Sequence, residues 1–394
     1  MNHRSNEPNG TTRRQALAVL GGCPALALFA DKAAAGEGEG DDGETADGAD
    51  WHRHVSLDTR LVREYGVRFP IVSAGMAFVG LTDLAAAVSN AGGIGVYGAA
   101  PEPPPVVDAR VAELAARAAG PFGVDFIIAS TPLGEFTTQD HIDVVAARRV
   151  PIVVFHFGVP PRGWVDQLHA AGSRVWVQAG SVDLAQGAAD VGADAIIAQG
   201  ASAGGHNRNL TIPTLALLSM IRAQVRGHHL ILAAGGIADG ESLVRALHTG
   251  ADGAWMGTRF VASAEAYAHP DYKARLVRAK GRNATTFTTV FGPEFPGRPQ
   301  RVLRNRAVTS PPSTEPPVIG TTTLFPGVVD APYQMPKYSA IVPTRDTQGD
   351  LDEMDMPAGS ESILAIDQVR PAGEIVADVI ADARHVIEHG PGHA

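Results

Sequence analysis

Eight short apolar runs that alternate with alanine-rich stretches constrain the fold of this 394-residue chain more than any other feature. The runs are almost continuously hydrophobic, which is typical of strands whose two faces are both covered. A regular succession of eight β/α units predicts a closed (β/α)8 barrel, the TIM-barrel architecture. The predicted strands are Ile71–Ala74, Ile94–Tyr97, Gly123–Ile128, Ile152–Phe157, Arg174–Gln178, Ala193–Ala198, Leu230–Ala234 and Gly253–Met256.

Helical patterns fill the intervals between these strands. An open, doubly wound sheet is the alternative architecture, but no Gly-x-Gly-x-x-Gly follows the first strand, so a dinucleotide-binding fold has little support. The predicted helices are Leu81–Ala91, Val107–Ala118, Val144–Arg149, Pro161–Ala171, Val182–Val191, Leu215–Val225 and Ser242–Gly250.

The periodic pattern fades after Phe260. Residues 281–355 are rich in Pro, Gly, Thr and Arg, which predicts an irregular, lid-like segment beside the barrel mouth. A last helical stretch, Pro371–Glu388, is expected to close the fold on the barrel's flank. The histidines at 385, 389 and 393 have helical spacing, but Gly390-Pro391-Gly392 breaks that helix, so we predict no metal site.

The N-terminus has the pattern of an export signal. Arg13 and Arg14 precede the apolar stretch Ala16–Ala30, which resembles a twin-arginine signal and is too short to span a bilayer comfortably. Residues 1–35 are therefore predicted to be a signal peptide, residues 36–50 an acidic disordered linker, and residues 51–390 the barrel domain. The expected location is periplasmic or extracellular.

The only cysteine, Cys23, lies in this signal, and the apolar run continues past it to Phe29, which argues against lipoprotein cleavage there. Cleavage after Ala35 would leave no cysteine, and hence no disulfide, thiolate metal site or cysteine nucleophile. The formal charge of −10 offers no basic stripe, so nucleic acid is not an expected partner. The sequence predicts no oligomeric state.

Three glycine-containing loops follow predicted strands six, seven and eight. The sixth strand runs into the loop Ala198–Arg208, whose glycines permit close approach to a ligand and which delivers a titratable histidine, His206. The turns at Gly235-Gly236 and Gly257-Thr258 come after strands seven and eight, where barrels usually bind a phosphate group. Together they predict a site at the C-terminal end of the barrel.

These motifs, in this order, resemble those of the nitronate monooxygenase family, and the resemblance covers most of residues 60–385. Residues 70–77 are similar to the family's first-strand motif, and Gln199–His206 matches its Gly-Gly-His loop. The resemblance implies a noncovalent FMN across the barrel mouth. Met76 and Ala77 would touch the flavin ring, Asp125 and Gln178 would flank it, Gly205 would approach it, and Ala234, Gly235, Gly236, Gly257 and Thr258 would hold the phosphate.

The resemblance also implies an enzyme that oxidises nitronates or nitroalkanes with O₂ to a carbonyl compound and nitrite. His206 would act as a base on a neutral nitroalkane or as a hydrogen-bond donor to a nitronate. Three residues depart from the family pattern: Gly75 replaces a common proline, Asp125 a common asparagine, and Gln178 a lysine of some relatives. His156, at the mouth end of strand four, is a second candidate site residue and equally compatible with a core position.

Two other functions stay open. Flavin-dependent enoyl-acyl carrier protein reductases share the scaffold and the loop but use NAD(P)H inside the cell, against which the export signal argues. Dehydrogenases of the inosine monophosphate type need a nucleophilic cysteine, which is absent. A non-catalytic exported flavin-binding protein is the remaining alternative, although such a protein has no need for His206.

Overall fold

The computed structural model describes residues 51–131, 134–292, 294–309 and 315–392. All of these belong to the compact unit that begins at Ala49. The predicted export signal, the acidic linker, Cys23 and His393 lie outside the described residues, so the predictions about them remain predictions.

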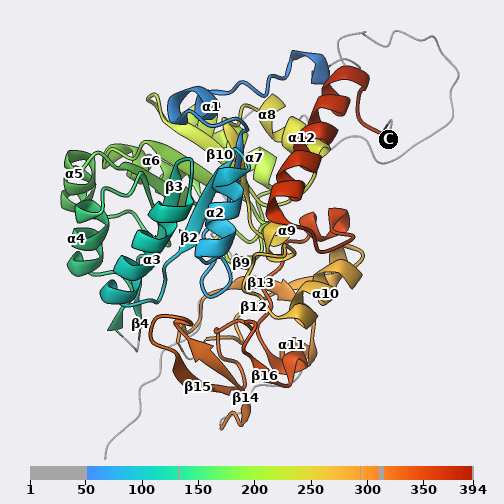
Figure 1. Ribbon diagram of the computed structural model, residues 1–394. Helices are drawn as coiled ribbons and strands as arrows, with labels where there is room; N and C mark the ends of the chain where they lie inside the picture. Colours follow the sequence, from blue (N-terminus) through green and yellow to red (C-terminus); the bar gives the residue numbers. More distant parts are fainter. Residues whose placement is uncertain (1–50, 132–133, 293, 310–314, 393–394) are drawn as a thin grey trace, which may run out of the picture. The chain divides into compact units, whose positions relative to one another are not determined.

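Eight parallel strands close into a barrel, as the sequence predicts (Figure 1). Each predicted strand is found with boundaries that differ by at most two residues. Around the barrel the order is β1-β11-β10-β8-β7-β6-β3-β2, which returns to β1. The strands are β1 (Ile71–Ser73), β2 (Ile94–Gly98), β3 (Phe122–Ile127), β6 (Ile152–His156), β7 (Arg174–Ala179), β8 (Ala195–Gln199), β10 (Leu230–Ala234) and β11 (Gly253–Met256).

Alternate residues of each strand fill the inside of the barrel. Val72, Val154 and Trp176 belong to this interior cluster, while their neighbours in the chain pack outward against the helices. The Trp176 indole N–H donates to the Tyr65 hydroxyl at 2.7 Å, so that a residue of α1 (Arg60–Tyr65) contributes to closing the N-terminal end. Because both strand faces are buried, the strands are continuously apolar, which is why the sequence pattern was readable.

Helices surround the barrel, and the last of them occupies the eighth position. Helix α12 (Ala372–His389) packs between α8 and α2, next to the strands β1 and β11 at which the barrel closes. It is the predicted closing helix. The others are α2 (Thr82–Asn90), α3 (Pro104–Arg117), α4 (Gln139–Ala147), α5 (Arg162–Ala170), α6 (Val182–Asp190), α7 (Thr214–Gln224) and α8 (Gly240–His248).

The segment between β11 and α12, residues 257–371, has more regular structure than the sequence predicts, and we call it the mouth extension. We expected residues 281–355 to be irregular, but they contain antiparallel strands that extend the barrel mouth (Figure 1). These strands are only two to seven residues long, and such short runs are difficult to detect in a Pro- and Gly-rich stretch. The elements are α9 (Thr258–Val261), α10 (Pro270–Arg278), β12 (Thr285–Thr288), β13 (Gln300–Leu303), α11 (Arg306–Thr309), β14 (Val318–Leu324), β15 (Ala331–Pro336) and β16 (Gln348–Gly349).

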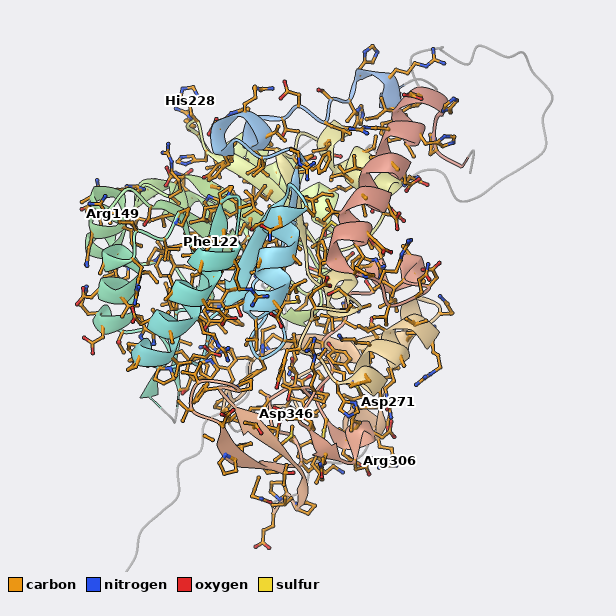
Figure 2. All side chains as sticks on the ribbon, viewed as in Figure 1. Phe122, Arg149, His228, Asp271, Arg306 and Asp346 are labelled. Atoms are coloured by element: carbon orange, nitrogen blue, oxygen red, sulfur yellow. The ribbon has the colours of Figure 1, made fainter. Side chains whose placement is uncertain are left out.

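Ion pairs hold this mouth extension together. Arg275 pairs with Asp352 at 2.8 Å, and Arg306 pairs with Glu353 at 2.9 Å and with Asp350. Figure 2 shows Arg306, Asp271 and Asp346 at this end of the molecule and His228 at the opposite end. Within the described ranges no group of acidic, histidine or cysteine side chains could hold a metal ion, and no helix there is long and apolar enough to cross a membrane.

Candidate active site

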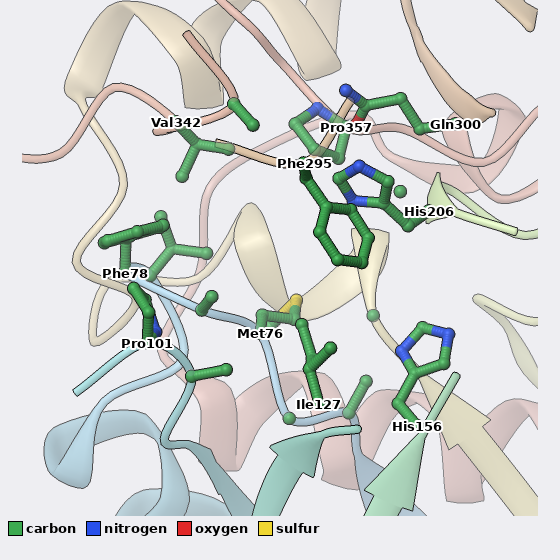
Figure 3. A pocket seen from close by; sticks show the side chains of 18 of the residues that line it. Met76, Phe78, Pro101, Ile127, His156, His206, Phe295, Gln300, Val342 and Pro357 are labelled. Atoms are coloured by element: carbon green, nitrogen blue, oxygen red, sulfur yellow. The ribbon is translucent and has the colours of Figure 1, made fainter. Parts of the chain in front are cut away.

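A cavity of about 740 Å³ opens at the C-terminal ends of the barrel strands. Its size is typical of sites for cofactors and small ligands. The barrel loops form one wall and the mouth extension forms the other, as the close view in Figure 3 shows with Met76 and Ile127 opposite Pro357 and Val342. Ten of the eleven predicted site residues line it: Met76, Ala77, Gln178, Gly205, His206, Ala234, Gly235, Gly236, Gly257 and Thr258.

The His206 loop is fixed from both sides. Residues 205 and 206 form the short strand β9 (Gly205–His206), which pairs antiparallel with β13 so that His206 lies opposite Gln300. On the barrel side, the Gln199 amide donates to the His206 carbonyl at 3.0 Å, and the Asn207 amide donates to the Gly200 carbonyl at 2.8 Å. These hydrogen bonds therefore hold the glycine-rich loop in one conformation, although its glycines alone suggest flexibility.

His206 stands among aromatic rings. Its ring centroid lies 4.8 Å from that of Phe295 and 5.7 Å from that of Phe157, both in edge-to-face geometry. Burial, and secondarily the positive charge of Arg298, lower the pKa of His206 to about 4. At pH 7 the imidazole is therefore neutral, with one nitrogen free to accept a proton and the other to donate a hydrogen bond. Its Nε2 has no hydrogen-bond partner among the described residues.

His156 joins the same group at the end of β6. Its ring stacks on the ring of Phe157 at 4.2 Å, and both residues line the cavity. Burial lowers the pKa of His156 to about 3, assisted by the nearby His206 and Arg208, so it is neutral too. Phe157 has a left-handed backbone, with φ of 71°. Such a conformation costs about 1–3 kcal/mol in a non-glycine residue and is concentrated at functional sites.

The two glycine turns form a cradle on the β10–β11 side. Gly235 and Gly236 have φ of 111° and 80°, and a Cβ at Gly235 would lie 2.7 Å from the backbone nitrogen of Ala203. The neighbouring Thr258 hydroxyl accepts the N–H of Gly359 at 3.0 Å, which leaves its own proton to be donated into the cavity. A phosphate group could be bound here by the closely approaching backbone, by the Thr258 hydroxyl as a donor and by the start of α9.

Asp125 is the predicted site residue that does not line the cavity. Its side chain lies behind the first loop, against Gly75: a Cβ at Gly75 would overlap it and lie 2.6 Å from its Oδ2. Two of the departures from the family pattern are thus in contact with each other. Burial raises the pKa of the Asp125 carboxyl well above its ordinary value, which favours its protonated form.

Sequence reasoning missed the residues that the mouth extension contributes. Phe295 and Gln300 line the cavity next to His206. Asp355 lines it as well, and its Oδ2 accepts a hydrogen bond from the Gln300 amide at 2.9 Å. Burial raises the pKa of the Asp355 carboxyl well above its ordinary value. The sequence predicts that residues 281–355 lie beside the barrel mouth, but no local signal indicates which of their side chains point inward.

Comparison with known proteins agrees with this geometry. The family model described as nitronate monooxygenase matches residues 58–382. A nitronate monooxygenase of Pseudomonas aeruginosa is 29% identical over 371 residues, which cover 83% of this chain and 100% of that protein.

Two solved structures are similar as well. FabK from Thermotoga maritima has a TM-score of 0.69 and 31% identity, covering 86% of this chain and 100% of that chain. Nitroalkane oxidase from Streptomyces ansochromogenes has a TM-score of 0.66 and 27% identity, covering 82% of this chain and 98% of that chain. The protein is an enzyme of the flavin oxidoreductase type, and the chain belongs to the nitronate monooxygenase family.

Proposed function

We propose that this enzyme uses FMN to oxidise alkyl nitronates or nitroalkanes with O₂, giving a carbonyl compound and nitrite. The observation that carries the proposal is a neutral His206 inside a cavity that also presents a phosphate-type cradle. The family match and the nitroalkane oxidase neighbour support this chemistry.

The residues present fit an FMN. Gly235, Gly236 and Thr258 would hold the phosphate, and the backbone of Met76 would lie against the ring, with Gln178 at its polar edge. When bound, the flavin supplies the two-electron acceptor that passes electrons from the substrate to O₂. Gln178 is neutral, so it can stabilise negative charge on the ring only through a hydrogen bond.

His206 would move the proton. For a neutral nitroalkane, its free nitrogen accepts the proton from the carbon next to the nitro group, a step that typically contributes about 10²–10⁴-fold to the rate. For a nitronate that is already ionised, the ring N–H would donate to the anion. The surrounding rings of Phe157 and Phe295 exclude water from this proton transfer.

An anaerobic titration tests the reaction. The purified protein should carry a flavin absorbance that bleaches on addition of a nitronate and returns when O₂ is admitted, with nitrite formed. Bleaching by NADH but not by a nitronate would contradict the proposal. That result would favour an enoyl-thioester reductase. This function stays a second candidate because FabK, an enoyl reductase, aligns as well as nitroalkane oxidase does. Bleaching by neither would favour a flavin-binding protein without turnover.

Replacing His206 tests its role. With a neutral nitroalkane, His206→Ala should lower kcat/KM about 10²–10⁴-fold, while turnover of the preformed nitronate falls much less. Because the pKa of His206 is about 4, the wild-type kcat/KM for the neutral substrate should stay level from pH 5 to 8. His228→Ala, at an exposed site on the opposite end, is the control. A variant at position 206 that oxidised neutral nitroalkanes at the full rate would disprove the assignment.

A further inference from the structure

The two ring nitrogens of His206 lie in different surroundings. Nε2 is enclosed by protein and has no hydrogen-bond partner among the described residues, whereas Nδ1 keeps contact with the open cavity. Two more enclosed atoms that lack a partner in the described part of the chain belong to residues of the same cavity wall, Oε1 of Gln300 and Oδ1 of Asp355. A buried polar atom without a partner is unfavourable, so these atoms need a physical explanation.

The backbone pairing brings the side chains of His206 and Gln300 together. The two residues lie opposite each other in the antiparallel pair of β9 and β13. The N–H of Asn207 donates to the Pro299 carbonyl at 3.0 Å, which makes His206 and Gln300 a non-hydrogen-bonded pair. In such a pair the side chains share one face of the sheet and approach each other more closely than in a hydrogen-bonded pair. Figure 3 shows the Gln300 side chain beside the His206 ring.

Asp355 determines the orientation of the Gln300 amide. The amide nitrogen donates to Asp355 Oδ2 at 2.9 Å, so the amide oxygen points to the other side. Gln300 is 0% exposed and Asp355 is 1% exposed, so bulk water does not compete for this bond. An amide oxygen can only accept a hydrogen bond. The Gln300 oxygen therefore suits a donor, and it does not suit a second acceptor.

We propose that Gln300 and Asp355 are positioning residues that keep the proton of the neutral His206 ring on Nε2. Gln300 Oε1 accepts the Nε2–H, directly or through one bridging water, and Nδ1 is left as the proton acceptor at the cavity. The nitrogen with which a histidine reacts is set in this way by the hydrogen bond of its other nitrogen. In the proposed oxidation, Nδ1 then takes the proton from the carbon next to the nitro group. That step rests on the proposed function, whereas the position of the ring proton does not.

This assignment deepens the proposed function by naming its substrate class. With its proton on Nε2, His206 presents a lone pair to the cavity, and a lone pair accepts a proton from a neutral nitroalkane. A nitronate is already an anion and needs a donor at the same place. The arrangement therefore favours neutral nitroalkanes over preformed nitronates.

The ring must be neutral for the position of its proton to matter. Burial, and secondarily the positive charge of Arg298, lower the pKa of His206 to about 4, so the ring is neutral from about pH 5 to 8. Burial raises the pKa of Asp355, and the negative charge of Glu294 acts in the same direction. The titratable and charged groups that interact with His206 or Asp355 are Arg298, His156, Glu294 and Tyr272.

Nitrogen NMR of the purified protein with isotopically labelled histidine tests the assignment. In a neutral imidazole the nitrogen that carries the proton and the one that does not have well separated signals, and His206→Ala identifies those of His206. We expect the wild-type ring to carry its proton on Nε2 from about pH 5 to 8. A wild-type ring with its proton on Nδ1 would overturn the proposal, even if nitroalkanes are oxidised.

Four variants test the two positioning residues. Gln300→Met keeps the length of the side chain but removes the acceptor, so the proton should be shared between the two nitrogens. Asp355→Leu should have the same effect because the amide loses its fixed orientation, whereas Asp355→Asn keeps an acceptor oxygen and should retain the wild-type signals. Gln334→Met, at an exposed position of β15, is the control. Unchanged protonation of Nε2 in Gln300→Met would contradict the role of Gln300, whether or not Asp355→Leu folds.

Kinetics separate this role from damage to the fold. Gln300→Met should lower kcat/KM for a neutral nitroalkane about two- to tenfold without lowering it for the preformed nitronate. An equal loss with both substrates would indicate a structural defect and contradict the proposal. If the wild type carries its ring proton on Nε2 but oxidises neither substrate, the positioning role stands and the proposed function fails.

Discussion

At the scale of single residues, the contact between Gly75 and Asp125 explains two unusual positions at once. The Asp125 side chain fills the space beneath the first loop that a Cβ at position 75 would otherwise occupy. Gly75 precedes Met76 and Ala77, which line the cavity. The shape of the cavity floor therefore depends on a residue that does not reach the cavity.

This contact predicts a coupled pair of mutations. Gly75→Ala should destabilise the protein by about 1–3 kcal/mol through overpacking, and weaken flavin retention because the first loop is displaced. Thermal unfolding and the flavin content after dialysis measure the two effects. Gly163→Ala, whose Cβ would meet nothing within 4 Å, is the control. The double variant Gly75→Ala/Asp125→Gly should be more stable than the sum of the single changes predicts; strict additivity would contradict the contact.

Local sequence allowed some site residues to be predicted and hid others. Gly235 and Gly257 follow barrel strands directly, and His206 lies in the loop after β8, so counting strands was enough to bring them to one end. Phe295 and Gln300 reach the same cavity through tertiary packing of a segment without clear periodicity. Asp125 lies within β3, so counting strands also places it in the barrel. Only the close approach of Gly75 shows that its side chain lies behind the first loop.

At the scale of elements, the position of the closing helix α12 depends on the close approach of its backbone to Gly240 of α8. Gly240 begins α8, and a Cβ there would overlap the backbone of Ala383 in α12 and lie 2.7 Å from its Cα. The Asp382 carboxylate accepts the Gly240 N–H at 2.7 Å, which fixes the two helices in register. The sequence predicted α12 from its apolar periodicity, but not this glycine's role, because the partner lies far along the chain.

A larger residue at position 240 should therefore weaken the packing of α12 against α8. We expect Gly240→Ala to lower the unfolding free energy by about 1–3 kcal/mol, since neither backbone can move without separating α8 from α12. Thermal or urea unfolding measures the change. Gly373→Ala, in α12 itself, would place its Cβ at an ordinary 3.9 Å from Ala91 and should be neutral or slightly stabilising. Equal stability of the two variants would contradict this account of the helix contact.

At the scale of the whole molecule, we propose that the protein is exported through its twin-arginine-type signal. The expected mature protein begins at Gly36, has no cysteine and carries a formal charge of about −12, after loss of four basic and two acidic residues. An export route for folded proteins suits an enzyme that binds its cofactor before crossing the membrane.

Cell fractionation tests this proposal. Changing Arg13 and Arg14 to lysine should keep the full-length chain inside the cell, whereas Arg4→Lys, outside the arginine pair, should leave export unchanged. The N-terminal sequence of the exported protein should begin at Gly36. Recovery of the double-lysine variant outside the cell in normal amounts would contradict this prediction.

The pairing of β9 with β13 has a consequence for the order in which the protein matures. The His206 loop is synthesised before the last two barrel strands, yet its partner residues Gln300 and Arg301 belong to a segment that follows all eight. Contacts between such distant parts of a chain form late, because the loop entropy must first be overcome. A growing chain could therefore complete the barrel strands while the histidine still lacked its final position. Activity would be acquired in a last folding step, after the scaffold itself is built.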